Sequence, residues 1–354
     1  MKIKKLTAIV LAAAMLLCMG IASFAEENAR IPENVLRAKE LSDRLGNRPI
    51  AIFPDGSIVV SRISDVDSSV FSAYAAQDTR KIVAAPYTDI AMLTHSGELY
   101  QGARQTAEGI ADIVYCTNNA NQSGYALTEA GALCYMHGEG APNTDSGYTN
   151  PADPFAVLAD SERHDFFYIT ESGALIVDGG NQYAWFEPVR ASWTDLVHVA
   201  AAKYKPDSEP EAMTIIGIRK DGSTVVAGDY AEEILGWGRL SWVAGAEGII
   251  IGVKEDGTLG ITGERGRKFR EDPRLANWKN IACVDVGTNS ISAIDTSGNY
   301  YFAIFQDYDE APTCAVFSPD GYFGGGFEVI RYYPDGTVRA ADNRTRTWNV
   351  LTDD

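Results

Sequence analysis

The stretch "VKEDGTLGIT", Val253–Thr262, combines short apolar segments with a polar turn around Gly257. A two-residue Asp-Gly turn would place Lys254 opposite Leu259, which breaks the alternation of apolar and polar side chains. A three-residue loop, formed by a type I turn and a left-handed glycine, places Val253 opposite Leu259 instead. The stretch therefore predicts a β-hairpin with a three-residue loop.

The same hairpin pattern recurs along the chain. Eight glycines occupy the equivalent turn position, at spacings of 34 to 49 residues. They are Gly56, Gly97, Gly131, Gly173, Gly222, Gly257, Gly298 and Gly336. The residue four before each glycine should face the residue two after it, and only Thr224 among these positions is neither apolar nor aromatic. Glycine suits the turn because other residues lose energy at positive φ.

A short apolar run precedes most hairpins, so each unit is expected to contain at least three strands. The runs are Ile82–Ala85, Ile113–Val114, Phe155–Leu158, Leu196–Val199 and Ile281–Val284. Three strands cannot bury both faces alone, so the units must stack on one another. A period near forty residues is typical of propeller blades. We predict an all-β propeller of seven or eight blades, with a solenoid or a sandwich as the alternative.

The two ends of the repeat region predict how the ring closes. The tail Thr347–Leu351, "TWNVL", resembles an opening strand without a hairpin, whereas the first hairpin, Ile50–Val60, lacks an opening strand. We expect the tail to complete the first blade and close a ring over residues 49–354, which removes an exposed edge. A further Pro-Asp-Gly turn in Phe317–Phe323 is expected to join the first two strands of the last unit.

Two copies carry additional features of a known repeat family. In "WTDLVHV…IIGIRKDGSTVVAGD" and "WKNIACVDVGTNSISAIDTSG", a tryptophan-led strand is followed by a glycine-containing hairpin. This pattern, over residues 79–351, resembles the regulator of chromosome condensation repeats, which form seven-bladed propellers. The family's histidine ahead of the hairpin and its Gly-Gln-Leu-Gly element are missing, and "GDYAEEILGWG" only approximates the latter. The resemblance implies a fold and not the guanine-nucleotide exchange of one nuclear branch.

The N-terminus predicts export. Residues 1–25 contain three lysines, an apolar run to Ala22 and then Ser-Phe-Ala, which is typical of a secretory signal peptide cleaved after Ala25. A retained membrane anchor is the alternative. Residues 26–48 are expected to form a helical segment that ends at Gly46, because Pro32 suits a first turn and leucines follow at helical spacing. We expect a secreted or cell-surface protein with no transmembrane segment after cleavage.

The composition restricts the class of partner. The chain has 48 acidic and 30 basic residues, a net charge of −18, and cleavage would remove three lysines to give 27 − 48 = −21. This charge repels phosphate backbones, so nucleic acid is excluded as a partner, whereas cations and basic surfaces remain candidates. The simplest reading of the acidic surface is solubility, and we expect a monomer. Cys116, Cys134, Cys283 and Cys314 match no zinc spacing and are expected to be reduced, buried thiols, with one or two disulfides as the alternative.

Three groups of residues are candidate binding sites. Arg265, Arg267, Lys268 and Arg270 in "ERGRKFRED" are candidates to bind a carboxylate or phosphate, and a loop balanced by neighbouring acids is the alternative.

Trp185 and Tyr183 in "NQYAWFE" would suit the face of a sugar, whereas aromatic packing between blades is the alternative. Asp307, Asp309 and Glu310 in "DYDE" are candidate calcium ligands, with a solvated acidic loop as the alternative.

Catalytic signatures are missing from the sequence. No GxSxG, HExxH, Walker or Rossmann pattern is present, so no catalytic residue and no cofactor other than calcium is assigned. Of the histidines, His95 is expected to be solvated in a turn and His198 to be a hydrogen-bonded core residue. We predict a secreted, non-enzymatic propeller that recognises a protein, peptide or glycan. The alternatives are an extracellular polysaccharide hydrolase or lyase and a structural spacer at the cell wall.

Overall fold

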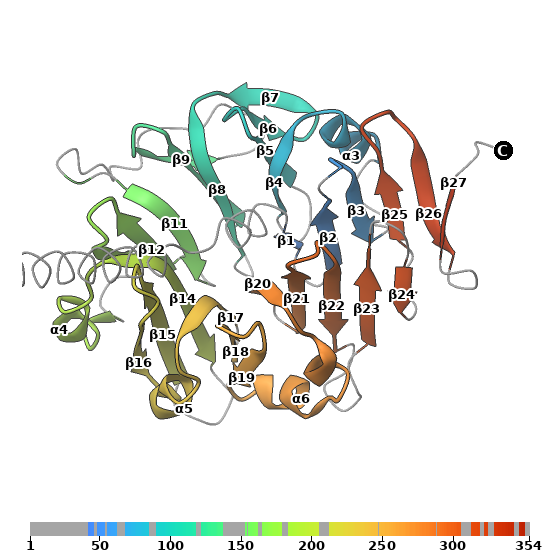
Figure 1. Cartoon of the computed structure of the whole chain (residues 1–354). Coiled ribbons are helices and arrows are strands. Elements are labelled where there is room, and N and C mark those ends of the chain that lie inside the picture. Colours follow the sequence, from blue (N-terminus) through green and yellow to red (C-terminus); the bar gives the residue numbers. More distant parts are fainter. Residues whose placement is uncertain are drawn as a thin grey trace, which may run out of the picture.

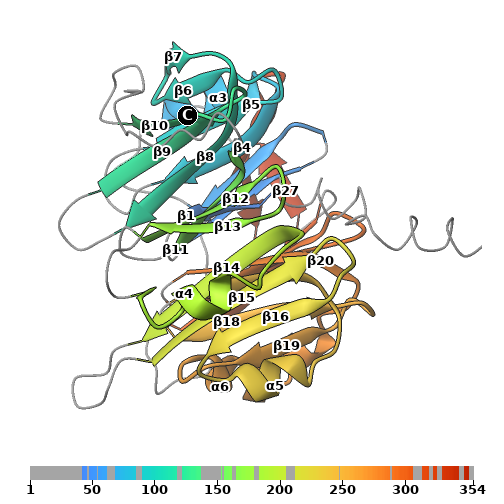
Figure 2. The same ribbon diagram turned by 90° about the vertical axis from the view of Figure 1, so that its left-hand side faces the viewer.

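The computed structural model describes seventeen segments of the chain. They are residues 42–45, 48–53, 55–61, 68–84, 90–117, 122–136, 153, 155–161, 165–178, 183–204, 212–246, 248–287, 289–305, 313–318, 322–324, 329–342 and 347–350. These segments form seven antiparallel sheets, which we call blades 1 to 7. The blades follow one another around the molecule (Figure 1) and lie side by side when it is turned (Figure 2).

Blades 2 to 6 have three or four consecutive strands each. Blade 2 comprises β4 (Thr79–Ala84), β5 (Ile90–Thr94), β6 (Leu99–Gln101) and β7 (Arg104–Ala107), and blade 3 comprises β8 (Ile110–Thr117), β9 (Gln122–Thr128) and β10 (Leu133–Met136). Blade 4 comprises β11 (Phe155–Ser161), β12 (Asp165–Thr170) and β13 (Leu175–Asp178), and blade 5 comprises β14 (Leu196–Tyr204), β15 (Ala212–Arg219) and β16 (Thr224–Gly228). Blade 6 comprises β17 (Leu240–Ala246), β18 (Ile249–Lys254) and β19 (Leu259–Thr262).

Blades 7 and 1 are larger. Blade 7 comprises β20 (Ile281–Val286), β21 (Ser290–Asp295), β22 (Tyr300–Ile304), β23 (Thr313–Phe317) and β24 (Tyr322–Gly324). Blade 1 comprises β1 (Ser42–Leu45), β2 (Arg48–Ile52), β3 (Ile58–Ser61), β25 (Val329–Tyr332), β26 (Val338–Asp342) and β27 (Thr347–Val350). The connections contain the helices α3 (Ser68–Ala75), α4 (Glu187–Arg190), α5 (Ala231–Leu235) and α6 (Gly266–Glu271), and the short 3-10 helix η2 (Leu275–Asn277).

The first strands of the seven blades form a closed ring. In chain order β4, β8, β11, β14, β17 and β20 each contact the next, and β1 contacts both β4 and β20. The chain is therefore a seven-bladed β-propeller, as the period of the hairpins predicts. Eight hairpins make seven blades because the first and the last hairpin share blade 1.

The ring closes differently from the sequence prediction. The tail strand β27 pairs with β26 as the outermost strand of blade 1, and β1 is the innermost strand. The N- and C-terminal parts meet where β3 pairs with β25, with Val60 opposite Ile330. The tail thus belongs to the blade of the first hairpin, as expected, but it is the outermost strand and not the opening one. A segment just before the first hairpin takes the inner position, because a local pairing closes a shorter loop.

Two smaller expectations are also corrected. Ser42–Leu45 is a strand, so the helix expected over residues 26–48 does not extend to Gly46, and its earlier part lies outside the described residues. The strands on either side of the Pro-Asp-Gly turn, β23 and β24, are the fourth and fifth strands of blade 7 and not the start of the last unit.

The repeated hairpins have the geometry that their sequence predicts. All eight turn glycines have φ between 73° and 85°. Every expected facing pair is observed, including Ile218 with Thr224 and Val253 with Leu259. In each turn the residue three before glycine donates its N–H to the carbonyl of the residue after glycine, as Lys254 does to Thr258 at 2.9 Å.

The hairpin tips also join neighbouring blades. The carbonyl oxygens of Gly173 and Gly257 accept the N–H groups of Leu196 and Ile281, the first residues of the next inner strands, at 2.9 and 3.0 Å. A Cβ added at Gly173 would lie 2.7 Å from the Cα of Asp195. The glycine therefore permits both a positive φ and this close approach.

Apolar side chains pack between adjacent blades. The largest cluster joins blades 6, 7 and 1 and includes Trp242, Ile251, Phe302 and Val59, all nearly inaccessible to solvent. Each sheet is thus covered on both faces by its neighbours, which no single blade could achieve. None of the helices in the described part of the chain has the length and apolar character needed to cross a lipid bilayer.

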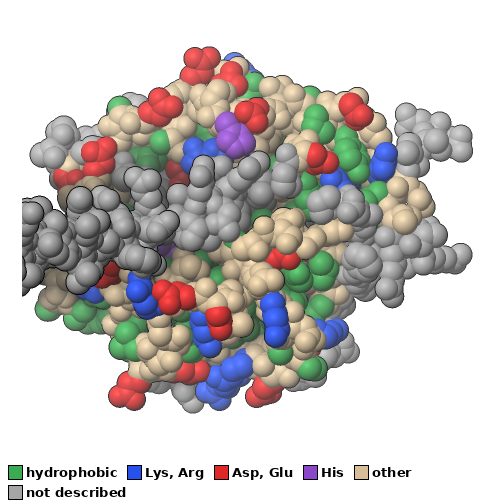
Figure 3. Space-filling model, in the orientation of Figure 1, with side chains coloured by type: hydrophobic (Ala, Val, Ile, Leu, Met, Phe, Trp, Pro, Cys, Tyr) green, Lys and Arg blue, Asp and Glu red, His purple; other side chains and the backbone are tan. Residues whose placement is uncertain are grey.

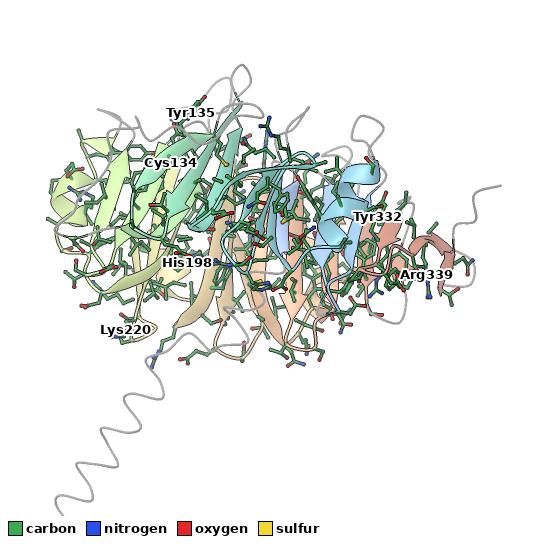
Figure 4. All side chains as sticks on the ribbon, turned by 90° about the horizontal axis from the view of Figure 1, so that it is seen from above. Cys134, Tyr135, His198, Lys220, Tyr332 and Arg339 are labelled. Atoms are coloured by element: carbon green, nitrogen blue, oxygen red, sulfur yellow. The ribbon has the colours of Figure 1, made fainter. Side chains whose placement is uncertain are left out.

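A buried arginine joins the two ends of the chain in blade 1. Arg331 of β25 is 1% exposed, and its Nη2 and Nε lie 2.9 and 2.8 Å from Asp55 Oδ2 and Ser57 Oγ of the first hairpin. Its guanidinium also lies 4.5 Å from the ring centre of Phe53 and 5.6 Å from that of Trp348. This part of blade 1, marked by Tyr332 and Arg339, is on the opposite side of the molecule from Lys220 of blade 5 (Figure 4).

Candidate functional site

The basic candidates lie on and next to α6, which connects blade 6 to blade 7. Phe269 is fully buried and packs against Phe305 with 4.3 Å between ring centres, so this residue fixes the inner side of the helix. Arg267 and Arg270 are exposed on the outer side, whereas Arg265 and Lys268 are half-buried. The four cations therefore do not share one face.

The charges of α6 are balanced by local acids. Arg267 Nη2 lies 3.0 Å from Glu264 Oε2, and Arg270 Nη1 lies 2.7 Å from Glu233 Oε1 of α5. The Arg265 guanidinium lies 5.3 Å from the ring centre of Tyr204, the last residue of β14. Basic side chains lie among acidic ones in the lower part of Figure 3. The geometry favours the balanced loop over a shared anion site.

Trp185 and Tyr183 do not form a joint aromatic face. Tyr183 is 2% exposed and makes an edge contact with Phe167, with 5.7 Å between the ring centres. Trp185 is 44% exposed. The two rings point in different directions because residues two apart in a helical turn are on opposite sides. Packing between blades explains Tyr183, and Trp185 remains a candidate contact residue.

Trp185 belongs to an exposed apolar area, which we call the α4 surface: Trp185, Pro188 and Val189. Only three large apolar side chains are exposed in the described residues, and Trp185 and Val189 are two of them; the third is Leu235 on α5. Phe186 anchors the segment from beneath, because it is fully buried and packs edge-on against Trp193 at 4.9 Å. The sequence predicted Trp185 as a contact residue but gave no indication of Val189.

The charged groups on α4 neutralise each other. Arg190 Nη2 lies 2.7 Å from Glu187 Oε2, and Arg190 Nε is 3.1 Å from each oxygen of the same carboxylate. Arg190 Nη1 also donates to the carbonyl oxygen of Leu175 at 2.5 Å, which ties α4 to the start of β13. The helix projects from the left edge of the molecule in Figure 1.

Three acids lie at the β12–β13 tip, next to this attachment. The Ser172 hydroxyl donates to Asp153 Oδ2 at 2.6 Å, and this bond, followed by one from Thr170, lowers the pKa of Asp153. Glu171 and Asp195 are exposed at the same place, since the Cβ position of Gly173 adjoins the Asp195 backbone. We call Asp153, Glu171 and Asp195 the acidic tip. The α4 surface thus has a negatively charged neighbour.

The inner ends of the blades contain polar contacts that the sequence did not reveal. Six of the inner strands have a bulge after their first residue. In three of them, β4, β14 and β17, the third side chain contacts the next blade. Lys81 Nζ lies 2.9 Å from Asp112 Oδ1, and His198 Nε2 lies 2.6 Å from the Val243 carbonyl oxygen. Trp242 Nε1 donates to the Val284 carbonyl oxygen at 2.8 Å. These contacts hold neighbouring blades together.

Both histidine expectations are confirmed. His198 is 7% exposed and hydrogen-bonded, and it stacks on Trp242 with 4.0 Å between the ring centres. His95 is exposed in a turn, where Nδ1 lies 3.1 Å from Asp78 Oδ1.

The calcium candidates Asp307, Asp309 and Glu310 lie outside the described residues. Within the described ranges no three His, Cys, Asp or Glu side chains are grouped as metal ligands would be. Cys134 and Cys283 are buried thiols and Cys314 is a half-buried thiol. The side chain of Cys116 is not described.

Cys314 is expected to react slowly with alkylating reagents. Burial raises the pKa of its thiol to about 11, against the opposing effect of Arg274. Only about one thousandth of the thiol is then ionised at pH 8, and the thiolate is the reactive form. We expect Cys314 labelling by iodoacetamide at pH 8, followed by mass spectrometry, to be at least tenfold slower in the native chain than in urea. Equal rates would contradict the burial seen here.

Comparisons with known proteins give only distant structural matches. No protein-family model matches it, and no curated protein sequence does. Solved structures of similar fold include yeast RCC1 (Prp20) bound to Kap60, with 11% identity, a TM-score of 0.45, and coverage of 64% of this chain and 70% of that one. Human WBSCR16 has 8% identity, a TM-score of 0.43 and coverage of 70% and 78%. BamB from Moraxella catarrhalis has 12% identity, a TM-score of 0.34 and coverage of 75% and 81%.

The yeast structure carries the name of the family that the repeats resemble in sequence. With TM-scores below 0.5, these likenesses carry no argument about the fold or a partner. The ring of inner strands in this chain is the direct basis for the seven-bladed fold.

Proposed function

We propose that the chain is an exported, non-enzymatic recognition module that binds a protein or peptide through the α4 surface. The observation that carries this proposal is the 44% exposure of Trp185 next to Val189, in a molecule whose other described tryptophans are buried or half-buried. Tryptophan is enriched among the residues that dominate protein interfaces. The leader-like residues 1–25 support export.

The surroundings of Trp185 favour a protein over a glycan. Sugar sites combine an aromatic face with polar groups that bind hydroxyls. Glu187 and Arg190 are the charged groups of α4, and they bind each other and Leu175. Tyr183, the second aromatic residue expected for a sugar site, is buried. An apolar partner side chain fits the remaining surface better.

Site-specific photo-crosslinking would test this function. Residues 26–354 would carry benzoylphenylalanine at position 189 or, as the control, at position 235 on α5, and would be irradiated with cell-surface and secreted proteins. We expect a defined protein adduct from position 189 that unlabelled wild-type chain suppresses and Trp185→Ser chain does not. Equal adducts from both positions, or a thermal shift with oligosaccharides alone, would contradict the proposal.

A further inference from the structure

The α4 surface and the acidic tip lie close enough for one short segment to contact both. Arg190, at the end of α4, binds the carbonyl oxygen of Leu175, which is two residues after Gly173 of the tip. Leu196 N–H binds the Gly173 carbonyl oxygen at 2.9 Å, so Asp195 is held at the same place. The connection is made by hydrogen bonds to backbone, and it fixes where the two groups lie.

The local charge is unbalanced at the tip and balanced on α4. Glu187 and Arg190 form a pair, so the apolar area carries no net charge of its own. At the tip, Ser172 stabilises the ionised form of Asp153, and Glu171 and Asp195 are exposed carboxylates. Lys220 and Arg219 are neighbouring cations, since the backbone N–H of Lys220 binds the Asp195 carbonyl oxygen at 2.7 Å and Arg219 pairs with Leu196. The tip therefore places three carboxylates beside a neutral apolar area.

We propose that the partner presents an apolar or aromatic side chain to Trp185, Pro188 and Val189, and lysines or arginines to Asp153, Glu171 and Asp195. This rests on the proposed function and specifies the chemistry of the partner. Charge complementarity is the basis: the partner's cations meet the tip at short range, and the net charge of residues 26–354, 27 − 48 = −21, attracts a basic segment at longer range. Acidic and neutral segments gain neither effect.

Leu235 provides a matched control for the apolar half of the surface. It is 51% exposed on α5, more than Trp185, but it stands alone between acidic residues and glycines. Single exposed apolar residues are common on protein surfaces and need no partner. A contribution from Trp185 and Val189 that Leu235 does not make would therefore identify the α4 surface and not general apolar exposure.

Fluorescence anisotropy with synthetic peptides tests the proposal. The probes are labelled twelve-residue peptides with a central Trp, Phe or Leu, flanked on both sides by Lys and Arg, by Glu, or by Ser. We expect wild-type residues 26–354 to bind the basic peptides at least tenfold more tightly than the acidic ones. Trp185→Ser with Val189→Ser should weaken this binding at least tenfold, and Leu235→Ser should leave it unchanged.

Separate variants test the contribution of the acidic tip. Glu171→Gln with Asp195→Asn should weaken the basic peptides about three- to tenfold and reduce the effect of salt, and Glu232→Gln on α5 should not. Asn suits position 195, where φ is 58°. Unfolding midpoints equal to wild type would show that every variant is folded.

The outcomes separate this inference from the proposed function. The inference is overturned if peptide affinity does not depend on the flanking charge, or if it is unchanged when Trp185 and Val189 are replaced. If position 189 still forms a protein adduct in that case, the recognition function stands and the partner chemistry is wrong. If neither peptides nor proteins bind at position 189, both fail.

Discussion

Replacing Arg331 with alanine is expected to lower the free energy of unfolding by about 3 kcal/mol, measured as a shift of the urea midpoint. Arg331 is 1% exposed and contacts the first hairpin through Asp55 and Ser57. Alanine would leave a large cavity and remove the stacking on Phe53, Tyr333 and Trp348. The loss concerns the one blade that joins the two ends of the chain, so it weakens closure of the whole ring.

The ion pair itself should contribute little of this loss. Asp55 is 49% exposed, so its carboxylate returns to water when Arg331 is removed and is not left as a buried charge. Asp55→Asn is a different test, because it leaves the buried guanidinium of Arg331 without this carboxylate; we expect it to cost about 3 kcal/mol, as loss of one partner of a buried pair does. Arg331→Met, which fills part of the space between the aromatic rings, should cost less than Arg331→Ala.

An exposed arginine supplies the control. Arg267 pairs with Glu264 at 3.0 Å with a half-exposed side chain, so Arg267→Ala should cost less than about 1 kcal/mol. A similar small loss for Arg331→Ala would mean that blade 1 closes through its β3–β25 backbone pairing alone, and that the arginine is dispensable.

The hairpins were predictable because their information is local. Eight glycines, each within a few residues of its facing apolar pair, specified turn type and register, and all eight registers are observed. The period of the glycines then predicted the propeller. Patterns of this kind depend on backbone geometry over about seven residues, and neighbouring blades do not alter them.

Ring closure was not predictable because it depends on distant partners. Val60 pairs with Ile330, and no local pattern links segments so far apart. Ser42–Leu45 was read as helix because leucines at positions 41 and 45 have helical spacing, and four residues carry little evidence of a strand. The tertiary environment decides such short segments.

The candidate site shows the same contrast between features set by local sequence and features set by distant residues. The sequence identified Trp185 but coupled it to Tyr183, which would hold for a strand, where residues two apart share a face. The structure has helical turns there, so one ring is buried and the other exposed. The charge of Arg270 is balanced by Glu233 of α5, which lies thirty-seven positions earlier. Sequence spacing could not indicate this pairing. The acidic tip likewise combines residues from three connections: Asp153 precedes β11, Glu171 follows β12, and Asp195 precedes β14.

Gly173→Ala and Gly257→Ala are expected to destabilise the chain by more than about 3 kcal/mol each. A left-handed φ costs an alanine about 1–2 kcal/mol. The larger part comes from the next blade: the added Cβ would lie 2.7 Å from the Asp195 Cα at position 173, and 2.8 Å from the Asn280 Cα at position 257. The atoms that the added Cβ would meet are backbone atoms just before an inner strand. A flexible side chain could move aside, whereas this contact can be relieved only by moving the next blade.

Gly336→Ala separates the two effects within the same protein. Gly336 occupies the same turn position with φ of 85°, but nothing in the described residues lies within 4 Å of its Cβ position. Its loss should be limited to about 1–2 kcal/mol, the cost of the dihedral angle alone. Urea midpoints of the three variants would therefore differ if the tips of blades 4 and 6 brace the blades that follow them. Equal losses at positions 173, 257 and 336 would mean that glycine is required only by the turn, and that adjacent blades are held together by their apolar faces.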